Sequence, residues 1–181
     1  MSDYVITTDS NSDVLPEFIK ENDLTIIPQY YSFGDTVYGD ELNMPPHEFY
    51  ETMRKGELPK SQANNPAVIR ERFEKILKEG KDILHIAFSS ALSGSCNNVM
   101  MTANELLEEY PGRKIRVFDS LNASLGEGVS VYHAVELWKE GKSMDEVYDV
   151  LEKERDHVNV SFTVNDLNHL QRGGRVSKTT A

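Results

Sequence analysis

Ten consecutive residues carry most of the side chains in this sequence that could do chemistry. The stretch SSALSGSCNN, residues 89–98, holds four serines, a glycine, two asparagines and the chain's one cysteine. It follows directly on the apolar run DILHIAF, residues 82–88, which is typical of a strand buried on both faces of a parallel sheet. Hydroxyls, a thiol and amides at a junction between a strand and a helix fit either a catalytic nucleophile or a cradle for an anion.

The nucleophile interpretation finds little support in the residues. An α/β hydrolase places its serine in a G-x-S-x-G turn, and no glycine stands two residues before any of these serines. His85 lies inside the apolar run, which favours a core position over a general base. Cys96 lies where the start of a helix would lower a thiol pKa, but a small residue packed in the first turn is the simpler interpretation. A serine or cysteine hydrolase or transferase stays open as an alternative.

An anion cradle needs hydrogen-bond donors rather than a base. The first turn of a helix leaves N–H groups without partners in the helix and carries partial positive charge, and serine hydroxyls add further donors. Neither G-x-x-x-x-G-K-[ST] nor G-x-G-x-x-G occurs in the chain. A carboxylate is therefore favoured, with a sugar-phosphate-binding domain as an alternative. Capping of the helix by Ser93 would explain that serine without any ligand.

A metal site built from aspartates is a further possibility. Asp9, Asp13, Asp40 and Asp119 lie near predicted strand ends or turns and could hold Mg²⁺. Turn formation, and capping by Asp13 of a helix over residues 13–22, explain them more simply. A single cysteine also excludes a multi-cysteine metal site. We therefore expect neither a metal nor a cofactor.

Composition limits the classes of function. The 181 residues include 19 Lys and Arg against 30 Asp and Glu, a net charge of -11, which would oppose binding to a phosphate backbone. We therefore expect no nucleic-acid partner. One cysteine cannot form an internal disulfide, and the chain shows neither an apolar signal segment nor an apolar run near the roughly 18 residues that span a membrane. These features predict a cytoplasmic protein with no membrane span.

Strand patterns alternate with helix patterns along the chain. Strands are predicted at 4–10, 82–88, 114–120 and 158–164, a hairpin around Gly34-Asp35, and helices at 13–22, 44–56, 66–80, 98–110, 122–141 and 143–157. The last helix opens with a capping box, Ser143 to Glu146. This order predicts an α/β fold with a mostly parallel sheet and helices on both faces. Ligands of such sheets bind beyond the carboxyl ends of the strands, where TTDSNSD, SSALSGS and DSLNASLG fall.

Five motifs together resemble the DegV family, the fatty-acid-binding proteins of bacteria. They are TTDSNSDVLPEF, LPKSQANNPAVI, IAFSSALSGSCNN, VFDSLNASLGEG and FTVNDLNHLQRGGRVSK, in the order and spacing of the family. The resemblance covers essentially the whole chain. It implies an α/β N-terminal domain over residues 1–157 and the beginning of a C-terminal domain over 158–181. That second domain is expected to be truncated, because family members continue well beyond this point.

The resemblance also implies a carrier without catalytic residues. Such proteins bind one long-chain fatty acid, of the palmitate class, and present its carboxylate to a partner fatty-acid kinase that makes the acyl phosphate. The carboxylate would be held by the hydroxyls of Ser61 and Ser93, with the Gly94 amide, Ser95 and Gln62 beside them. The family's loop usually reads T-S-Q-P-S where this chain has KSQANNP, so whether Ser61 or Gln62 faces the ligand stays open.

The acyl chain would supply most of the affinity, since each buried CH₂ contributes about 0.8 kcal/mol. Candidate wall residues of an apolar tunnel are Ile27, Tyr30, Phe33, Leu121 and Leu125. Because the second domain would normally cover the tunnel, we expect the 181-residue chain to bind fatty acid weakly or to expose apolar surface.

Overall fold

The computed structural model describes residues 4–164, 167–174 and 177. Its centre is a parallel sheet of four strands in the order β2-β1-β6-β7. The strands are β1 (Tyr4–Asp9), β2 (Thr25–Ile27), β6 (Asp82–Ala87) and β7 (Ile115–Asp119). The chain runs from β1 to β2 on one side and then crosses to β6 on the other. The carboxyl ends of β1 and β6 are therefore the topological switch point, where such sheets open a crevice.

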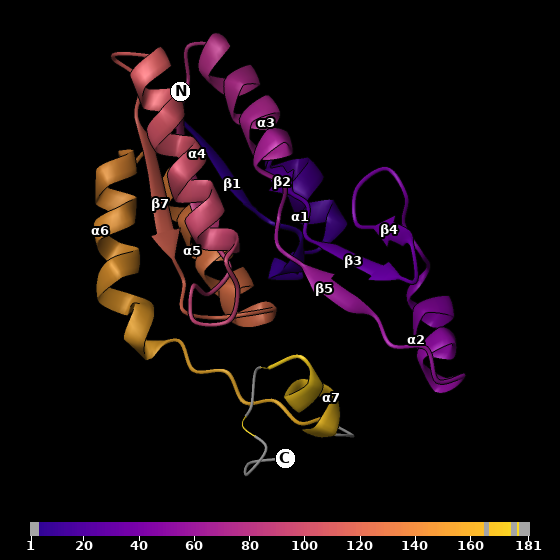
Figure 1. Cartoon of the computed structure of the whole chain (residues 1–181). Coiled ribbons are helices and arrows are strands. Elements are labelled where there is room, and N and C mark those ends of the chain that lie inside the picture. Colours follow the sequence, from indigo (N-terminus) through magenta and orange to yellow (C-terminus); the bar gives the residue numbers. More distant parts are fainter. Residues whose placement is uncertain (1–3, 165–166, 175–176, 178–181) are drawn as a thin grey trace.

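Helices cover both faces of this sheet, as the sequence predicts (Figure 1). One face carries α1 (Pro16–Glu21), α5 (Leu125–Lys139) and α6 (Met144–Glu154), and the other carries α3 (Pro66–Lys78) and α4 (Ser95–Glu109). Consecutive residues of β6 enter opposite cores, since Ile83 packs under α3 and α4 while Leu84 packs under α5 and α6. Burial on both faces explains why this strand reads as a continuous apolar run.

A second, antiparallel sheet lies beside the first (Figure 1). Its strands β3 (Tyr30–Phe33), β4 (Thr36–Tyr38) and β5 (Lys60–Gln62) are ordered β4-β3-β5. The predicted turn at Gly34-Asp35 joins the first two, with Gly34 at a φ of 54°. The ring of Phe49 in α2 (Pro46–Arg54) contacts the rings of Tyr31 and Phe33. We call residues 30–62 the arm.

The arm is tied to the main sheet by one arginine of α3. Arg72 forms an ion pair with Asp40 of the arm at 2.6 Å and donates a hydrogen bond to the carbonyl of Ile26 in β2. The hydroxyl of Tyr30 donates to the same Asp40 carboxylate at 3.4 Å. The position of β5 relative to the main sheet therefore depends on contacts distant in sequence.

The structure corrects two local predictions. The first helix begins at Pro16 rather than Asp13, because proline favours the first helical position; Asp13 has a φ of 54° and accepts a hydrogen bond from Ser124. The predicted strand 158–164 is wrong, since this segment runs without strand pairing from η2 (Arg155–His157) toward α7 (Leu167–Arg172). Within the predicted C-terminal segment, 165–166, 175–176 and 178–181 lie outside the described residues.

The capping box that starts α6 is confirmed, with the Ser143 and Glu146 side chains each bonded to the other's backbone N–H. Among the helices of the described ranges, none combines the length and the apolar content that crossing a membrane requires.

Candidate functional site

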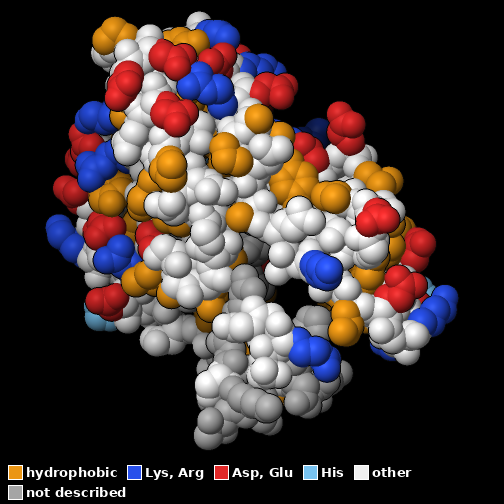
Figure 2. Space-filling model, viewed as in Figure 1, with side chains coloured by type: hydrophobic (Ala, Val, Ile, Leu, Met, Phe, Trp, Pro, Cys, Tyr) orange, Lys and Arg blue, Asp and Glu red, His pale blue; other side chains and the backbone are white. Residues whose placement is uncertain are grey.

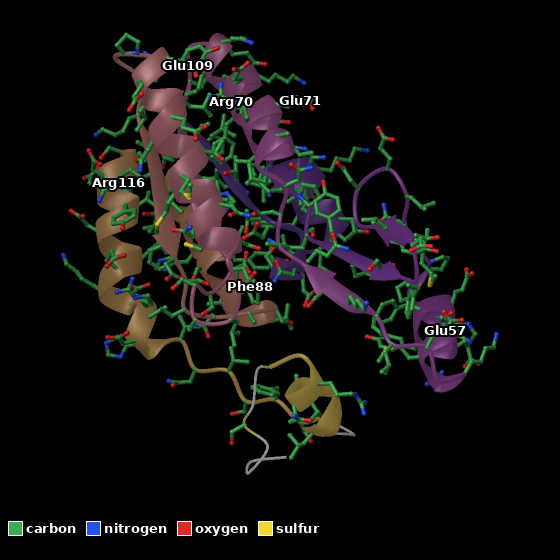
Figure 3. All side chains as sticks on the ribbon, in the orientation of Figure 1. Glu57, Arg70, Glu71, Phe88, Glu109 and Arg116 are labelled. Atoms are coloured by element: carbon green, nitrogen blue, oxygen red, sulfur yellow. The ribbon has the colours of Figure 1, made fainter. Side chains whose placement is uncertain are left out.

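A cavity of about 930 Å³ opens at the switch point between β1 and β6. Phe88, directly after β6, lines it, and Figure 3 shows this residue at the lower end of α4, with Arg70 and Glu109 near the opposite end. The β5 strand and α7 contribute further lining residues, and Figure 2 shows an opening between these two elements. The cavity therefore lies where ligands of parallel α/β sheets bind.

The cavity wall carries polar groups on a largely apolar lining. Ser61 and Gln62 from β5 and Ser93 and Gly94 before α4 are among the polar lining residues, together with Asn11, Gln29, Ser124, Asn159 and Ser161. The apolar lining includes Leu92, Leu125, Val129, Val160, Phe162 and Leu170. A cavity of this kind suits an amphiphile with a small polar head and an apolar body.

Four of the five predicted site residues thus line one cavity, although they come from segments about thirty residues apart in sequence. The fifth, Ser95, is fully buried directly behind Ser93. Its Oγ lies 2.9 Å from Ser93 Oγ, and its backbone N–H donates to Ser93 Oγ at 3.2 Å. The structure therefore gives Ser95 a contact with Ser93 rather than a position on the cavity wall.

Of the five candidate wall residues, two line the cavity and three do not. Tyr30 and Leu125 line the cavity. Ile27 and Phe33 are buried in the fold, and Leu121 is exposed without lining the cavity. Core and tunnel positions share an apolar composition, so sequence does not separate them.

Behind the serines runs a chain of hydrogen bonds that ends at a buried carboxylate. Ser95 Oγ donates to Gln29 Oε1 at 2.8 Å, and Gln29 Nε2 donates to Asp9 Oδ1 at 2.9 Å. Asp9, the last residue of β1, is fully buried. It also accepts from the Phe88 N–H at 2.8 Å and from Asn64 Nδ2 at 3.4 Å. These N–H donors compensate for the loss of water around the charge.

Sequence reasoning missed Gln29 and Asn64. Asn64 belongs to the KSQANNP loop that carries Ser61, and its backbone N–H lies 3.3 Å from Ser95 Oγ. Gln29 comes two residues after the end of β2, so its place at a strand end was an available signal.

Sequence reasoning also missed Glu127, a fully buried carboxyl group in the first turn of α5. Burial, and then the charge of Asp9, raise the pKa of Glu127 to about 9. The contacts of Thr8 agree, because its Oγ1 lies 2.9 Å from the Ile86 carbonyl and 3.0 Å from Glu127 Oε1. With a pKa of about 9, Glu127 is neutral near pH 7, and its proton then faces Thr8 while the Thr8 proton faces the Ile86 carbonyl.

The residues considered as a nucleophile and a base occupy core positions. Cys96 is fully buried, and desolvation together with nearby carboxylates raises the pKa of its thiol to about 12. His85 is also fully buried, with Nδ1 2.9 Å from Thr7 Oγ1 and Nε2 3.7 Å from Asp9 Oδ2. Neither arrangement favours attack on a ligand in the cavity.

The four aspartates considered for a metal are separated. Asp40 of the arm pairs with Arg72 of α3, and Asp13 accepts a hydrogen bond from Ser124. Asp119 accepts from the backbone N–H groups of Ser90 and Leu121. Over the part of the chain that the structure describes, no three His, Cys, Asp or Glu side chains are grouped so that they could hold a metal ion.

A second cavity, of about 660 Å³, lies at the opposite, amino-terminal end of the sheet. Tyr4, Asn22, Lys81 and Trp138 are among its lining residues, and it contains none of the predicted site residues. A ligand could therefore bind in either of two cavities, and an experiment that locates the ligand can distinguish between them.

Comparison with known proteins gives one consistent family. The family model described as "Uncharacterised protein, DegV family" matches residues 3–181. A DegV domain-containing protein of Clostridium perfringens is 39% identical over 183 residues, covering 100% of this chain and 63% of the relative. The chain thus spans just under two thirds of the length of the curated relatives it matches.

Solved structures of the DegV family resemble this chain along nearly its whole length. A fatty-acid-binding DegV family protein from Thermus thermophilus has a TM-score of 0.84 and 29% identity, covering 98% of this chain and 62% of that one. DegV from Bacillus subtilis, described as a fatty-acid-binding protein, has a TM-score of 0.83 and 26% identity, with coverage of 98% and 62%.

Proposed function

Because the chain belongs to the DegV family, we propose that it binds a long-chain fatty acid in the cavity at the switch point. The carboxylate accepts hydrogen bonds from Ser61, Ser93 and the Gly94 amide, with Gln62 beside them. The acyl chain lies along the apolar wall that includes Leu125 and Phe162. The solved relatives described as fatty-acid-binding proteins support this assignment.

The observation that carries the proposal is the composition of the cavity wall. Ser61, Ser93 and the start of α4 line the same cavity, and most of the remaining lining is apolar. The N-terminus of a helix of this length attracts a negative charge. An anionic head and an apolar tail are the two properties that such a wall selects together.

The apolar wall has the larger share of the binding energy. Burying fifteen methylenes at about 0.8 kcal/mol each contributes on the order of 12 kcal/mol before the costs of association. Hydrogen bonds to the carboxylate add roughly 1.5 to 3 kcal/mol each. The serines therefore select the head group and its position, while the acyl chain supplies affinity.

The same family membership supports two further parts of the proposal. Residues 1–157 form the N-terminal domain, and 158–181 begin a second domain that covers the acyl chain. The bound carboxylate is then presented to a fatty-acid kinase, which transfers a phosphoryl group to it. The protein itself acts as a carrier and takes no part in bond breaking.

The test is lipid retention by serine variants. The protein is purified without detergent, and native mass spectrometry with solvent extraction identifies non-covalently bound acids. We expect a long-chain acid on the wild-type chain and its loss from the Ser61→Ala, Ser93→Ala double variant. The matched control is Ser90→Ala, an exposed serine of the same motif that does not line the cavity.

Unchanged retention by the double variant would show that the carboxylate is held elsewhere. A covalent adduct on Ser93 or Cys96 would instead support the nucleophile alternative. Saturable binding of a sugar phosphate by a chain free of lipid would favour the third interpretation.

A further inference from the structure

We propose that Gln29, held by Asp9, is a positioning residue that directs the hydrogen bonds of the two serines so that Ser93 alone of the pair can donate to the bound carboxylate. The inference rests on the proposed function and adds to it two residues that do not belong to the predicted site. It follows from the direction of each hydrogen bond in the chain Asp9, Gln29, Ser95 and Ser93.

The direction is set at the buried end. A carboxylate can only accept, so the side-chain N–H₂ of Gln29 faces Asp9 Oδ1, at 2.9 Å. The Gln29 amide oxygen then faces Ser95 Oγ, at 2.8 Å. Gln29 is held in place by its own backbone N–H, which donates to Ser10 Oγ at 2.9 Å. Its side chain therefore cannot reverse without leaving Asp9 facing an oxygen.

The proton of Ser95 is committed as a consequence. An amide oxygen cannot donate, so Ser95 must donate to Gln29, and a hydroxyl has one proton. Ser95 Oγ is left as an acceptor, and the Asn64 N–H lies 3.3 Å from it. Ser95 is also fully buried, so it has neither a proton nor an open path toward the ligand.

Ser93 is in the opposite situation. Its Oγ accepts from the Ser95 N–H at 3.2 Å and lies 2.9 Å from Ser95 Oγ, to which it donates. Both contacts hold the oxygen of Ser93 on the cavity wall. Its proton is the mobile one, because rotation about the Cβ–Oγ bond redirects it from Ser95 to an arriving carboxylate. Gln29 also lines the cavity, and together with Asp9 it fixes the direction of the hydrogen bonds that run through Ser95 to Ser93.

A pair of matched ligands separates positioning from general stability. Palmitate and hexadecanol have similar chains, but only palmitate brings a carboxylate. Affinities of the 181-residue chain for both are measured by equilibrium titration, together with the melting temperature of each variant. We expect Gln29→Leu to lower the affinity for palmitate roughly tenfold and to change the affinity for hexadecanol by no more than about twofold. The reason is that leucine removes the hydrogen bonds to both Asp9 and Ser95.

A second variant, Gln29→Glu, keeps the hydrogen bonds to Asp9 and Ser95 only while the new carboxyl group is protonated. In Gln29→Glu the introduced carboxyl lies beside the Asp9 carboxylate, which disfavours the loss of its proton. When protonated, it donates to Asp9 and accepts from Ser95, as the amide does. When ionised, it faces Asp9 with a second negative charge and the pattern is broken.

The preference of Gln29→Glu for palmitate over hexadecanol should therefore be near that of wild type at pH 5.5 and fall by pH 7.5. The titratable and charged groups around Gln29 and Asp9 are His85 on β6, Glu127 on α5, Cys96 on α4 and Asp119 on β7, and on the side of the arm Tyr30 with Asp40 and Arg72. All of them are present in both proteins. The preference of the wild-type protein, measured at each pH, is the reference. Dividing by it removes the effect of these groups and the effect of the ligand's own titration.

The outcomes distinguish the two proposals. If wild type binds palmitate no better than hexadecanol, the carboxylate site itself fails. If wild type discriminates and both Gln29 variants discriminate equally well at every pH, the positioning role is overturned. Loss of both ligands in parallel by a folded Gln29→Glu chain, without recovery at pH 5.5, would also overturn it, because that result indicates a structural role alone.

Discussion

Asp9 and Glu127 are two neighbouring buried carboxyl groups that avoid an unpaired buried charge in different ways. Asp9 receives N–H donors from Gln29, Asn64 and Phe88. Glu127 keeps its proton instead, because desolvation and the charge of Asp9 raise its pKa to about 9. This pair therefore contributes one negative charge behind the cavity wall and not two, which matters for a site that is to hold an anion.

The proton on Glu127 makes stability depend on pH. The folded-state pKa of about 9 exceeds the ordinary value of 4.5, so folding takes up a proton between these values. The free energy of unfolding then falls as pH rises through this window, on the order of 1.4 kcal/mol per pH unit from this group. Glu127→Gln keeps a neutral donor toward Thr8 and should remove that dependence.

Urea denaturation between pH 5 and 8.5 checks this expectation. Glu127→Gln should be more stable than wild type at the alkaline end, with the difference shrinking toward pH 5. Glu136→Gln, an exposed position on the same helix, is the control. Equal pH slopes for wild type and Glu127→Gln would mean that Glu127 is ionised in the folded protein.

The sequence was informative for some residues of the site and silent for others. Ser93 and Gly94 stand at a strand-to-helix junction, where local pattern predicts the start of a helix and free amides. Ser61 was predicted to bind the ligand because it lies in the motif LPKSQANNPAVI. Gln29 and Glu127 matter because of what lies next to them in space, and no spacing along the chain encodes a hydrogen bond across 66 residues, as between Ser95 and Gln29.

At the scale of elements, the close packing of α5 on the loop after β1 shapes one wall of the cavity. Gly128 lies in the first turns of α5, and a Cβ there would lie 2.6 Å from the Ser12 carbonyl oxygen in η1 (Ser10–Ser12). A real Cβ does not approach an oxygen so closely. Glycine at this position therefore lets the helix approach the end of β1, while Leu125 and Val129 of the same helix line the cavity.

Gly128→Ala should destabilise the protein. Alanine favours a helix over glycine by about 1 kcal/mol, but overpacking of a tight contact costs typically about 1 to 3 kcal/mol. We expect a net loss of roughly 1 kcal/mol in the free energy of unfolding. Urea denaturation measures it, with Glu136→Ala as the helix control. A Gly128→Ala variant more stable than wild type would show that the helix can shift freely.

Elements with a strong local signal were predictable, and one was not. The buried strand β6 and the capping box of α6 follow from the apolar run and from Ser143 with Glu146. The alternation in VNVSFTV predicts a strand, yet Val158, Val160 and Phe162 of this segment line the cavity instead. Alternating apolar residues indicate that one side of an extended segment is covered. They do not indicate whether a neighbouring strand or another part of the protein covers it.

At the scale of the molecule, the chain joins a closed core to an open binding surface. The main sheet is covered on both faces, whereas Leu125 and Phe162 on the cavity wall are 62% and 77% exposed. These side chains agree with the expectation that the chain exposes apolar surface. The chain spans 63% of its Clostridium perfringens relative. We propose that apolar surface of a second domain covers these residues and tightens binding.

An amide map by NMR locates the carboxylate of a bound fatty acid. The ¹⁵N-labelled chain is titrated with palmitate, and the amide shifts are mapped onto the structure. We expect the largest shifts at Ser61, Gln62, Ser93 and Gly94. Shifts confined to the cavity that Tyr4 and Trp138 line, or no shifts at saturating palmitate, would contradict it.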